Sequence, residues 1–344
     1  MFTPKWEITD LLLSQIKEIA VLTAELNHRS YPKTVLAVFE KKANSLSAHA
    51  STSIEGNPLP LTEVKKLLKS KPENIRDTQR EVLNYNHILE KLNEKIKQGA
   101  VEVDISFLCG VQQEVTSGLI EKFRCGRLRT EPVFVNDPHT GQTLYWPPDH
   151  QNVPDLMKSL IKFIKEKRGK VEPLILAGIF HKQFVILHPF MDGNGRTARL
   201  ATKALLADMG LNTFNLFSFE NYYNQNVAAY FQNVGVTGNY YEIAEAIDFT
   251  KWLEYFTGGI LDELLRVKKE LETNVRTPES VLQSHHKKIL DFIGRNGFIT
   301  DRDYAKLTPR AKATRALDFK KLLELGLIKR FGKGRLTHYK LKVE

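Results

Sequence analysis

The chain has 344 residues, of which 42% are hydrophobic and 26% are charged. This composition is that of an ordinary folded protein, and it excludes collagen-like and low-complexity chains. The only two cysteines, Cys109 and Cys125, provide neither a disulfide framework nor a four-cysteine zinc site, which favours a reducing compartment.

The formal net charge of +10 is concentrated near one end of the chain. Residues 281–344 hold sixteen Lys and Arg against six Asp and Glu, so the remainder is balanced. This distribution indicates a separate basic module with an anionic partner. The first residues lack an apolar segment followed by a small-residue cleavage site, and the most apolar run, 173–187, is too short to span a bilayer. We therefore expect a cytoplasmic location without membrane contact.

Apolar residues recur at spacings of three and four along most of the chain, which predicts a mainly helical fold. In the first region the pattern indicates amphipathic helices over 6–26 and 76–96 and a helical run that ends at Gly56. Pro58 and Pro60 prevent that run from continuing. Later helices are expected over 104–121, 152–168, 173–187, 197–210, 223–234 and 248–271.

One segment departs from the helical pattern. Over 131–147, β-branched and aromatic residues flank the turn-forming residues 137–141, which predicts a β-hairpin. An exposed strand edge can pair with an extended target peptide through main-chain hydrogen bonds. The alternative is that Tyr145 and Trp146 only pack on the core. The second strand would contain Thr143, Leu144, Tyr145 and Trp146.

These patterns divide the chain into four parts. Residues 1–100 form an N-terminal helical region, and 101–271 form a core that contains the hairpin. A polar linker follows over 272–280, before the basic module at 281–344.

The stretch HPFMDGNGRTAR, residues 188–199, gathers residues suited to phosphate chemistry. A residue before proline disfavours the helical conformation, so the preceding helix should end at His188 and leave its imidazole at a loop. The chain should then enter a new helix near Arg196, whose first N–H groups lack internal partners and attract anions.

Two arginines and an acid complete this arrangement. Arg196 and Arg199 are three residues apart and therefore neighbours on one helix face, while Asp192 offers a hard oxygen ligand suited to Mg²⁺. No lysine or third glycine completes a P-loop or dinucleotide fingerprint. Each feature alone would be an ordinary turn or a solvated side chain, but together they favour a nucleotide site. The loop before the helix contains Gly193, Asn194 and Gly195.

This stretch matches, without departure, the motif H-P-F-x-D-G-N-G-R-x-x-R of Fic-domain proteins, and the chain resembles that family over about 30–262. The resemblance implies a Fic-type helical bundle with a β-hairpin flap. It also implies an enzyme that moves AMP from ATP, with Mg²⁺, to a Ser, Thr or Tyr hydroxyl of a protein. In this site His188 would accept the hydroxyl proton and Asp192 would hold Mg²⁺. The implied phosphate-binding residues are Gly193, Asn194, Gly195, Arg196 and Arg199.

Other details stay open at this point. Asn226 and Tyr230, in the segment 223–234, are candidates for the adenine pocket. Transfer of the γ-phosphate would make the chain a kinase, although that branch of the family departs from the last part of the motif. A nucleotide other than ATP, self-modification and a homodimer are further alternatives. The rival from another class is a DNA-binding transcriptional regulator whose core only senses nucleotide.

The segment STSIEGN, residues 51–57, resembles the inhibitory motif Ser-x-x-x-Glu-Gly-Asn of the class with an N-terminal inhibitory helix. The resemblance implies that Glu55 pairs with Arg199 and displaces ATP from its productive pose. Gly56 would end the helix in the left-handed conformation in either case. In some relatives the glutamate helps water to remove AMP again, so a de-AMPylase stays possible. The other residues of the motif are Ser51 and Asn57.

The basic module is predicted as three helices followed by two strands. This order resembles a winged helix-turn-helix domain, which could lay its third helix in the DNA major groove and its wing on phosphates. Lys312 and Arg315 would share a face of the third helix. The alternative is a basic face on a domain that binds protein. The wing would contain Lys329, Arg330, Gly332, Lys333, Gly334 and Arg335.

Overall fold

The computed structural model describes residues 2–28, 31, 33–70, 72, 74–99, 101–137, 140–208, 215–216, 218–274, 282–332 and 334–342. The chain divides into two compact units, Met1–Lys269 and Glu270–Glu344. Most of the predicted linker, 275–280, lies outside the described residues, as do Lys333 of the predicted wing and residues 138–139 of the hairpin turn.

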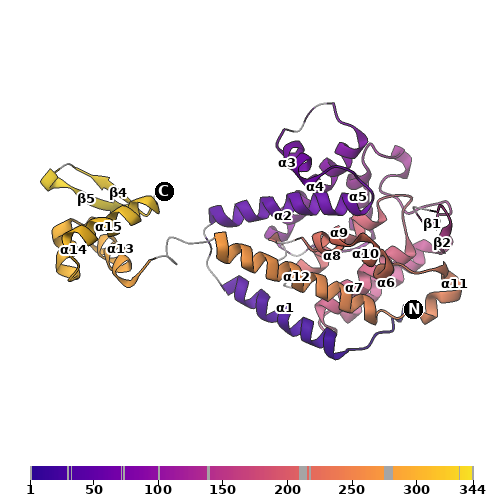
Figure 1. Cartoon of the computed structure of the whole chain (residues 1–344). Coiled ribbons are helices and arrows are strands. Elements are labelled where there is room, and N and C mark those ends of the chain that lie inside the picture. Colours follow the sequence, from indigo (N-terminus) through magenta and orange to yellow (C-terminus); the bar gives the residue numbers. More distant parts are fainter. Residues whose placement is uncertain are drawn as a thin grey trace. The chain divides into compact units, whose positions relative to one another are not determined.

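The larger unit is mainly helical (Figure 1). Its strands are β1 (Val135–Asn136), β2 (Thr143–Trp146) and β3 (Gly238–Asn239), with short 3-10 turns η1 (Lys122–Arg124) and η3 (Ala244–Ala246). Its helices are α1 (Asp10–His28), α2 (Lys33–Ile54), α3 (Leu61–Ser70), α4 (Asp77–Gln98), α5 (Ile105–Thr116), α6 (Val153–Lys167), α7 (Pro173–Leu187), α8 (Asn194–Asp208), α9 (Phe219–Gln225), α10 (Val227–Val234), α11 (Tyr240–Ile243) and most of α12 (Thr250–Asn274).

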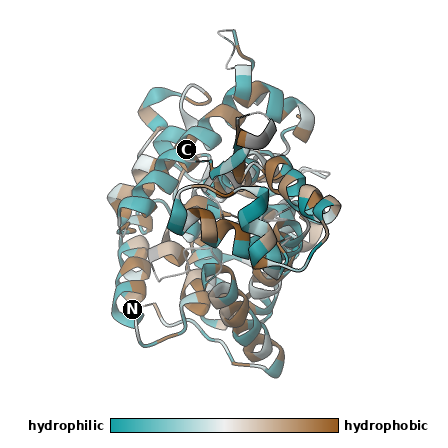
Figure 2. Ribbon diagram, turned by 90° about the vertical axis from the view of Figure 1, so that its left-hand side faces the viewer, coloured by the Kyte–Doolittle hydropathy of each residue, from teal (hydrophilic) through white to brown (hydrophobic). Residues whose placement is uncertain are grey.

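Helix α7 is the central helix of this unit. Thirteen of its fifteen residues are buried, as expected for a helix that is apolar on all sides and covered by neighbours. Helices α6 and α8 pack against it, and Trp252 of α12 donates a hydrogen bond to the Gly178 carbonyl at 2.7 Å. Figure 2 shows that brown, apolar residues alternate with teal, hydrophilic residues along the helices. Within the described residues, no helix has the length and apolar character needed to cross a membrane.

Helix α2 belongs to the same core because it packs against α4, α8 and α9. Its inner side carries small residues, such as Ala48, which is fully buried. One buried carboxylate, Glu220 of α9, links α2 to its neighbours. It accepts hydrogen bonds from Ser47 at 3.1 Å, Tyr85 at 2.9 Å and Ser218 at 2.9 Å. Three hydroxyl donors satisfy a charge that would otherwise be costly to bury. The helix that leads into the predicted inhibitory motif is therefore fixed in the core.

The predicted hairpin segment forms part of a three-stranded sheet in the order β1-β2-β3. β2 pairs antiparallel with β1 and parallel with β3, so that Tyr145 lies opposite both Val135 and Gly238. β2 therefore lies between two strands and has no free edge at Tyr145. The reason is β3, a strand of two residues that no sequence pattern indicated. Within this sheet, the strands with one unpaired side are β1 and β3.

Two predicted helices differ from the structure. The helix expected over 104–121 ends at Thr116, two residues before Gly118, which has a left-handed φ of +70°. The helix expected over 223–234 is broken at Asn226, whose φ of −146° and ψ of 81° are not helical. The Asn226 side chain accepts a hydrogen bond from the Ala229 N–H at 3.0 Å and so caps α10.

The smaller unit contains α13 (Ser284–Asn296), α14 (Asp301–Leu307) and α15 (Lys312–Glu324), followed by the antiparallel strands β4 (Ile328–Phe331) and β5 (His338–Leu341). A short 3-10 turn, η4 (Gly334–Leu336), lies between the strands. The unit has its own core. The order of elements is the one predicted from the sequence. The fully buried members of this core include Ile289, Ile299, Tyr304 and Leu322.

Candidate active site

Helix α7 ends at Leu187, as the following His188–Pro189 pair predicted. His188 adopts φ 46° and ψ 59°, and it is the one non-glycine residue with positive φ within the described ranges. This left-handed backbone conformation costs a non-glycine residue of order 1–3 kcal/mol, and residues in such conformations are concentrated at functional sites. The backbone therefore turns sharply at the residue that the motif makes the base.

The loop after His188 is held by hydrogen bonds to its backbone groups. Arg129 donates from Nε to the His188 carbonyl at 2.8 Å, and from its backbone N–H to the Pro189 carbonyl at 2.9 Å. Asn194 pairs with both polar groups of Phe190, since its Oδ1 accepts from the N–H at 2.9 Å and its Nδ2 donates to the carbonyl at 2.8 Å. The Asn194 side chain thus faces the loop, and what it can offer an anion is its backbone N–H.

Helix α5 supports the second half of the loop. Gln112 is fully buried and donates from Nε2 to the Asp192 carbonyl at 3.1 Å. Gly193 has φ +78°, and a Cβ there would lie 2.8 Å from Thr116 Cγ2. A larger residue is therefore excluded both by backbone conformation and by space. The loop reaches the first turn of α8 with little freedom to move.

Arg199 lies fully buried beneath this turn. Its guanidinium donates to the Ser51 hydroxyl at 2.7 Å, the Ser51 carbonyl at 2.9 Å and Glu55 Oε1 at 2.7 Å. A longer contact of 3.4 Å reaches the Tyr230 hydroxyl. Although burial opposes the charge, Glu55 keeps the pKa of Arg199 above its ordinary value. The predicted inhibitory motif and the motif arginine are thus in direct contact.

The Glu55 carboxylate also lies against the first turn of α8. A methyl group added at Gly195 would overlap Glu55 Oε1, so the carboxylate occupies the space in front of that residue. A helix N-terminus attracts anions. Glu55, whose side chain is 29% exposed, therefore sits where the phosphate of a nucleotide would meet α8.

Arg196 is paired with two acids. Its Nη1 lies 2.7 Å from Glu81 Oε1, and its Nη2 lies 3.0 Å from Asp192 Oδ2. Glu81 also accepts a hydrogen bond of 2.7 Å from Asn57 of the inhibitory motif. Burial raises the pKa of Glu81 even though Arg196 opposes the shift. Sequence reasoning missed Glu81, because an acid inside an amphipathic helix carries no signal of a partner far along the chain.

The half-buried His188 imidazole is suited to accept a proton. Its Nδ1 lies 3.3 Å from the Val185 carbonyl, which can only accept, so Nδ1 carries the hydrogen and Nε2 keeps the lone pair. Burial lowers the pKa of the imidazole, and the positive charge of Arg129 acts in the same direction. Both effects favour the neutral form of the ring.

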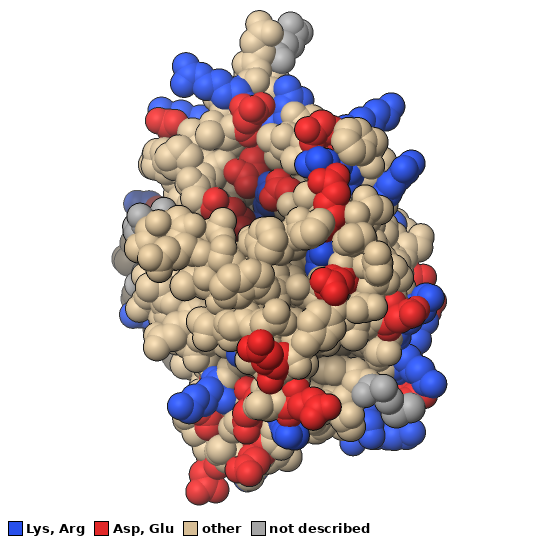
Figure 3. All heavy atoms as spheres, turned by 90° about the vertical axis from the view of Figure 1, so that its right-hand side faces the viewer, with Lys and Arg blue, Asp and Glu red and all other residues tan. Residues whose placement is uncertain are grey.

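A cavity connects these groups. Residues of the inhibitory motif, the β1-β2 hairpin, α7, α8 and α10 line it, including Glu55, Val135, Tyr145, His188, Gly195, Arg199 and Tyr230. Tyr230 is buried, and its hydroxyl lies 3.1 Å from His181 Nε2. Asn226, the other adenine candidate, is not among the lining residues. Figure 3 shows acidic and basic side chains gathered in a hollow on one face of the molecule.

Asp192 fits the role of a Mg²⁺ ligand. Its side chain is 46% exposed, while Arg196 and the Gly193 N–H orient its oxygens. An exposed carboxylate beside a phosphate site is the usual Mg²⁺ partner. Its present pairing with Arg196 would have to loosen for the ion to bind.

The four residues of β2, the predicted docking strand, differ in how far they are buried. Tyr145 is 3% exposed, and its hydroxyl donates to the Ile186 carbonyl at 3.0 Å. Leu144 and Trp146 are exposed at 41% and 42%, and Thr143 is half-buried. Packing on the core, the alternative considered for this strand, thus describes Tyr145 but not Trp146.

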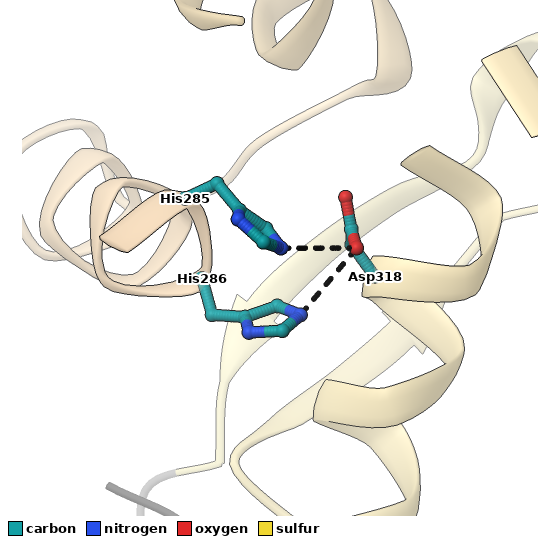
Figure 4. Close-up of side chains that lie close together, drawn as sticks. All are labelled: His285, His286 and Asp318. Atoms are coloured by element: carbon teal, nitrogen blue, oxygen red, sulfur yellow. Dashed lines mark ion pairs between the residues drawn. The ribbon is translucent and has the colours of Figure 1, made fainter. Parts of the chain in front are cut away.

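A second polar cluster lies in the smaller unit, where His285 and His286 turn Nε2 toward Asp318 Oδ1 at 3.3 and 3.4 Å (Figure 4). Such spacing resembles a metal site. The Gln283 N–H, however, donates to His286 Nδ1 at 3.1 Å, so the neutral ring carries its hydrogen on Nε2, the atom a metal would need. The Arg310 guanidinium also lies 3.0 Å from Asp318 Oδ2. The cluster is therefore a buried carboxylate surrounded by hydrogen-bond donors.

Arg315, predicted to face DNA from α15, is engaged within the smaller unit. It lies 2.8 Å from Asp301 Oδ1 and donates to the Arg310 carbonyl at 2.8 Å. The side chains of Lys312, Lys329 and Arg330 are exposed. These three side chains remain available to an anionic partner, whereas the Arg315 guanidinium links α15 to α14.

Comparisons with known proteins find relatives of part of this chain. Residues 102–206 match the model of the Fic/DOC family. The chain is 28% identical over 174 residues to a protein adenylyltransferase Fic of Nematostella vectensis, which covers 49% of this chain and 39% of that protein. It is 26% identical over 201 residues to the protein adenylyltransferase Fic-1 of Caenorhabditis elegans, with 57% and 38% covered. The chain thus spans about two fifths of the length of these curated relatives.

Solved structures show the same fold. A Fic family protein from Desulfovibrio desulfuricans has a TM-score of 0.63 at 20% identity, with 100% of this chain and 99% of that chain covered. Fic-1 of Caenorhabditis elegans has a TM-score of 0.59 at 21% identity, with 77% and 74% covered. Residues 102–206 therefore form a Fic domain, and the chain is homologous to the protein adenylyltransferases of that family.

Proposed function

We propose that this protein is a self-inhibited adenylyltransferase that moves AMP from ATP to a hydroxyl group of a protein. The observation that carries the proposal is one cavity in which a neutral imidazole, His188, meets the N-terminus of α8 and the buried Arg199. In-line attack of a hydroxyl on a phosphate is promoted by a base that lies next to a preorganised anion site.

In this reaction His188 Nε2 takes the proton of the attacking hydroxyl. The new bond joins the hydroxyl oxygen to the α-phosphorus of ATP, and the bond to pyrophosphate breaks. Arg196, Arg199 and the α8 N–H groups stabilise the negative charge on the phosphates. Asp192 would hold Mg²⁺, which when bound neutralises part of the phosphate charge.

Glu55 supports the inhibitory part of the proposal. Its carboxylate is 2.7 Å from Arg199 Nη2 and lies against Gly195, so it occupies both groups that the outer phosphates of ATP would use. A displacement of about 1 Å at the reacting centre can cost roughly a hundredfold in rate. ATP that binds beside Glu55 would thus be held out of line.

The target segment is expected to dock on β1. The outer side of β1 is unpaired within the sheet, and Val135 lines the cavity together with His188. An extended peptide paired with Val135 and Asn136 would pass the imidazole without any requirement on its own side chains. Phe134, which is 55% exposed, offers an apolar contact beside that edge.

Mass spectrometry of the Glu55→Gly protein after incubation with Mg·ATP tests the function. We expect AMP on a protein target or on the enzyme itself, at a rate roughly a hundredfold above the parent, and no AMP when His188→Ala is added. A Glu55→Gly protein that binds ATP but leaves AMP neither on itself nor on any other protein present would remove the proposal. Label from the γ-phosphate instead of the α-phosphate would make the protein a kinase.

A further inference from the structure

Arg129 is a buried cation with unusual partners. Its side chain is 3% exposed, and within the described residues no acid forms an ion pair with it. Its guanidinium instead donates to three backbone carbonyls: Nε to His188 at 2.8 Å, Nη1 to Glu131 at 3.2 Å and Nη2 to Pro148. Its own N–H donates to the Pro189 carbonyl at 2.9 Å.

These carbonyls belong to three separate segments. His188 starts the motif loop, Glu131 precedes β1, and Pro148 follows β2. One side chain thus joins the loop that carries the base to both ends of the hairpin that is proposed to dock the target. A planar guanidinium with five fixed donors can make such contacts, whereas a lysine offers a single ammonium group.

The His188 carbonyl is the contact with the clearest consequence. His188 has a left-handed backbone, which is unfavourable for a residue with a side chain. A hydrogen bond from a charged donor is stronger than one from a neutral donor. Arg129 therefore opposes relaxation of the backbone that aims the imidazole.

We propose that Arg129 is a positioning residue that fixes the hairpin and the His188 backbone as one body, so that a target docked on β1 meets the base at a set distance. This inference rests on the proposed function. Arg129 is not among the residues that line the cavity, so its role concerns the base and the target and not the nucleotide.

The test compares variants in the Glu55→Gly background. Arg129→Gln removes the charge and shortens the reach, Arg129→Lys keeps the charge, and Arg124→Gln is the matched control. Arg124 lies on the same segment, is partly exposed and pairs with the Glu131 carboxylate at 3.2 Å. Each variant is measured for kcat and KM with the protein that Glu55→Gly labels in the mass spectrometry above, or with the enzyme itself if that is where the AMP is found. ATP affinity by calorimetry and melting temperature are also measured.

We expect Arg129→Gln to lower kcat roughly a hundredfold, the loss typical of a base displaced by about 1 Å. Its ATP affinity should stay within about twofold of the background. Arg129→Lys should recover part of the rate, and Arg124→Gln should match the background. An unchanged kcat in Arg129→Gln, or equal losses of rate and ATP affinity, would overturn the inference.

A readout without catalysis separates this inference from the proposed function. In Arg129→Gln, NMR titration should show a higher pKa for His188, because a positive charge that lowers it has been removed. Amide exchange at Val135 and Asn136 should also become faster, since the hairpin has lost its attachment. If neither changes, Arg129 does not position these parts, whether or not Glu55→Gly transfers AMP.

Discussion

The loop over 188–195 and the inhibitory segment over 51–57 meet in the same cavity but are held in different ways. The loop is fastened through backbone carbonyls by Arg129, Asn194 and Gln112. The inhibitory segment is attached to the two arginines of α8. Arg199 contacts Ser51 and Glu55, and Asn57 reaches Arg196 by way of Glu81.

The two kinds of contact therefore serve different purposes: the first fixes the geometry of the loop, and the second would regulate access to the nucleotide site. The carbonyl contacts involve no group that a phosphate would bind, so they persist when nucleotide enters. The contacts of the inhibitory segment use the two arginines that are proposed to bind the nucleotide, so in the proposed reaction one set of contacts would replace the other. Inhibition of this kind leaves the catalytic loop undistorted, and removal of one carboxylate should be enough to restore activity.

The largest effect on stability and activity is expected for a variant that removes the hydrogen bonds within the loop. Asn194→Ala leaves the N–H and carbonyl of Phe190 unpaired, and each unsatisfied buried group costs about 1–3 kcal/mol. We expect the free energy of unfolding, measured with urea, to fall by about 2–4 kcal/mol. In the Glu55→Gly background AMP transfer should fall roughly a hundredfold.

A buried asparagine outside the site provides the control for that variant. Asn93 donates to Asn44 Oδ1 at 2.9 Å, and Asn93→Ala should lower stability without changing the transfer rate of the remaining folded protein. Equal rates for Asn194→Ala and Asn93→Ala would show that the loop does not depend on Asn194.

The pH dependence of transfer should report the base. His188 must be neutral to accept a proton, and burial lowers its pKa below the ordinary value of 6.5. The rate constant kcat/KM of the Glu55→Gly protein should therefore be constant above pH 7. It should fall by about tenfold per pH unit once pH drops below the lowered pKa. A midpoint at or above 6.5, measured with buffers of matched ionic strength, would contradict this assignment.

The smallest effect should come from the outer contact of the inhibitory segment. Asn57→Ala removes the hydrogen bonds of the Asn57 side chain to Glu81, the Thr78 carbonyl and the Leu59 N–H, each worth about 1 kcal/mol. Glu55 keeps its contact with Arg199. We expect AMP transfer to rise by a few-fold, well below the gain in Glu55→Gly. Ser53→Ala, which alters a hydroxyl that lies 3.5 Å from His49 of the same helix, should leave the rate unchanged. A gain as large as that of Glu55→Gly would mean that Asn57 holds the segment in place.

Local rules predicted the parts of the site that depend on neighbours in sequence. Pro189 fixed the end of α7, and the apolar run 173–187 became the core helix. α8 begins at Asn194, two residues before the expected start, so Asn194 and Gly195 belong to its first turn and not to the loop. The motif placed His188 and Arg199 in one cavity because both flank a short loop.

What the sequence could not predict depends on partners far along the chain. Arg129 contacts His188, which lies 59 positions further along the chain, and Glu81 contacts Arg196, more than a hundred positions away. The sequence around Arg129 and Glu81 gives no sign of these contacts. β3 is too short to produce a pattern, yet it covers one side of β2. Arg315 was expected on an open face because spacing alone does not reveal the acid that holds it.

The burial of α2 limits how the inhibitory carboxylate can leave. Ser47, Ala48, Ala50 and Ser51 are fully enclosed, so the helix is not an arm that can swing away from the domain. The carboxylate has to move by torsion about the side-chain bonds of Glu55, a motion that takes picoseconds to nanoseconds for exposed groups. If Glu55 inhibits as proposed, the change between inactive and active forms would require no unfolding of α2.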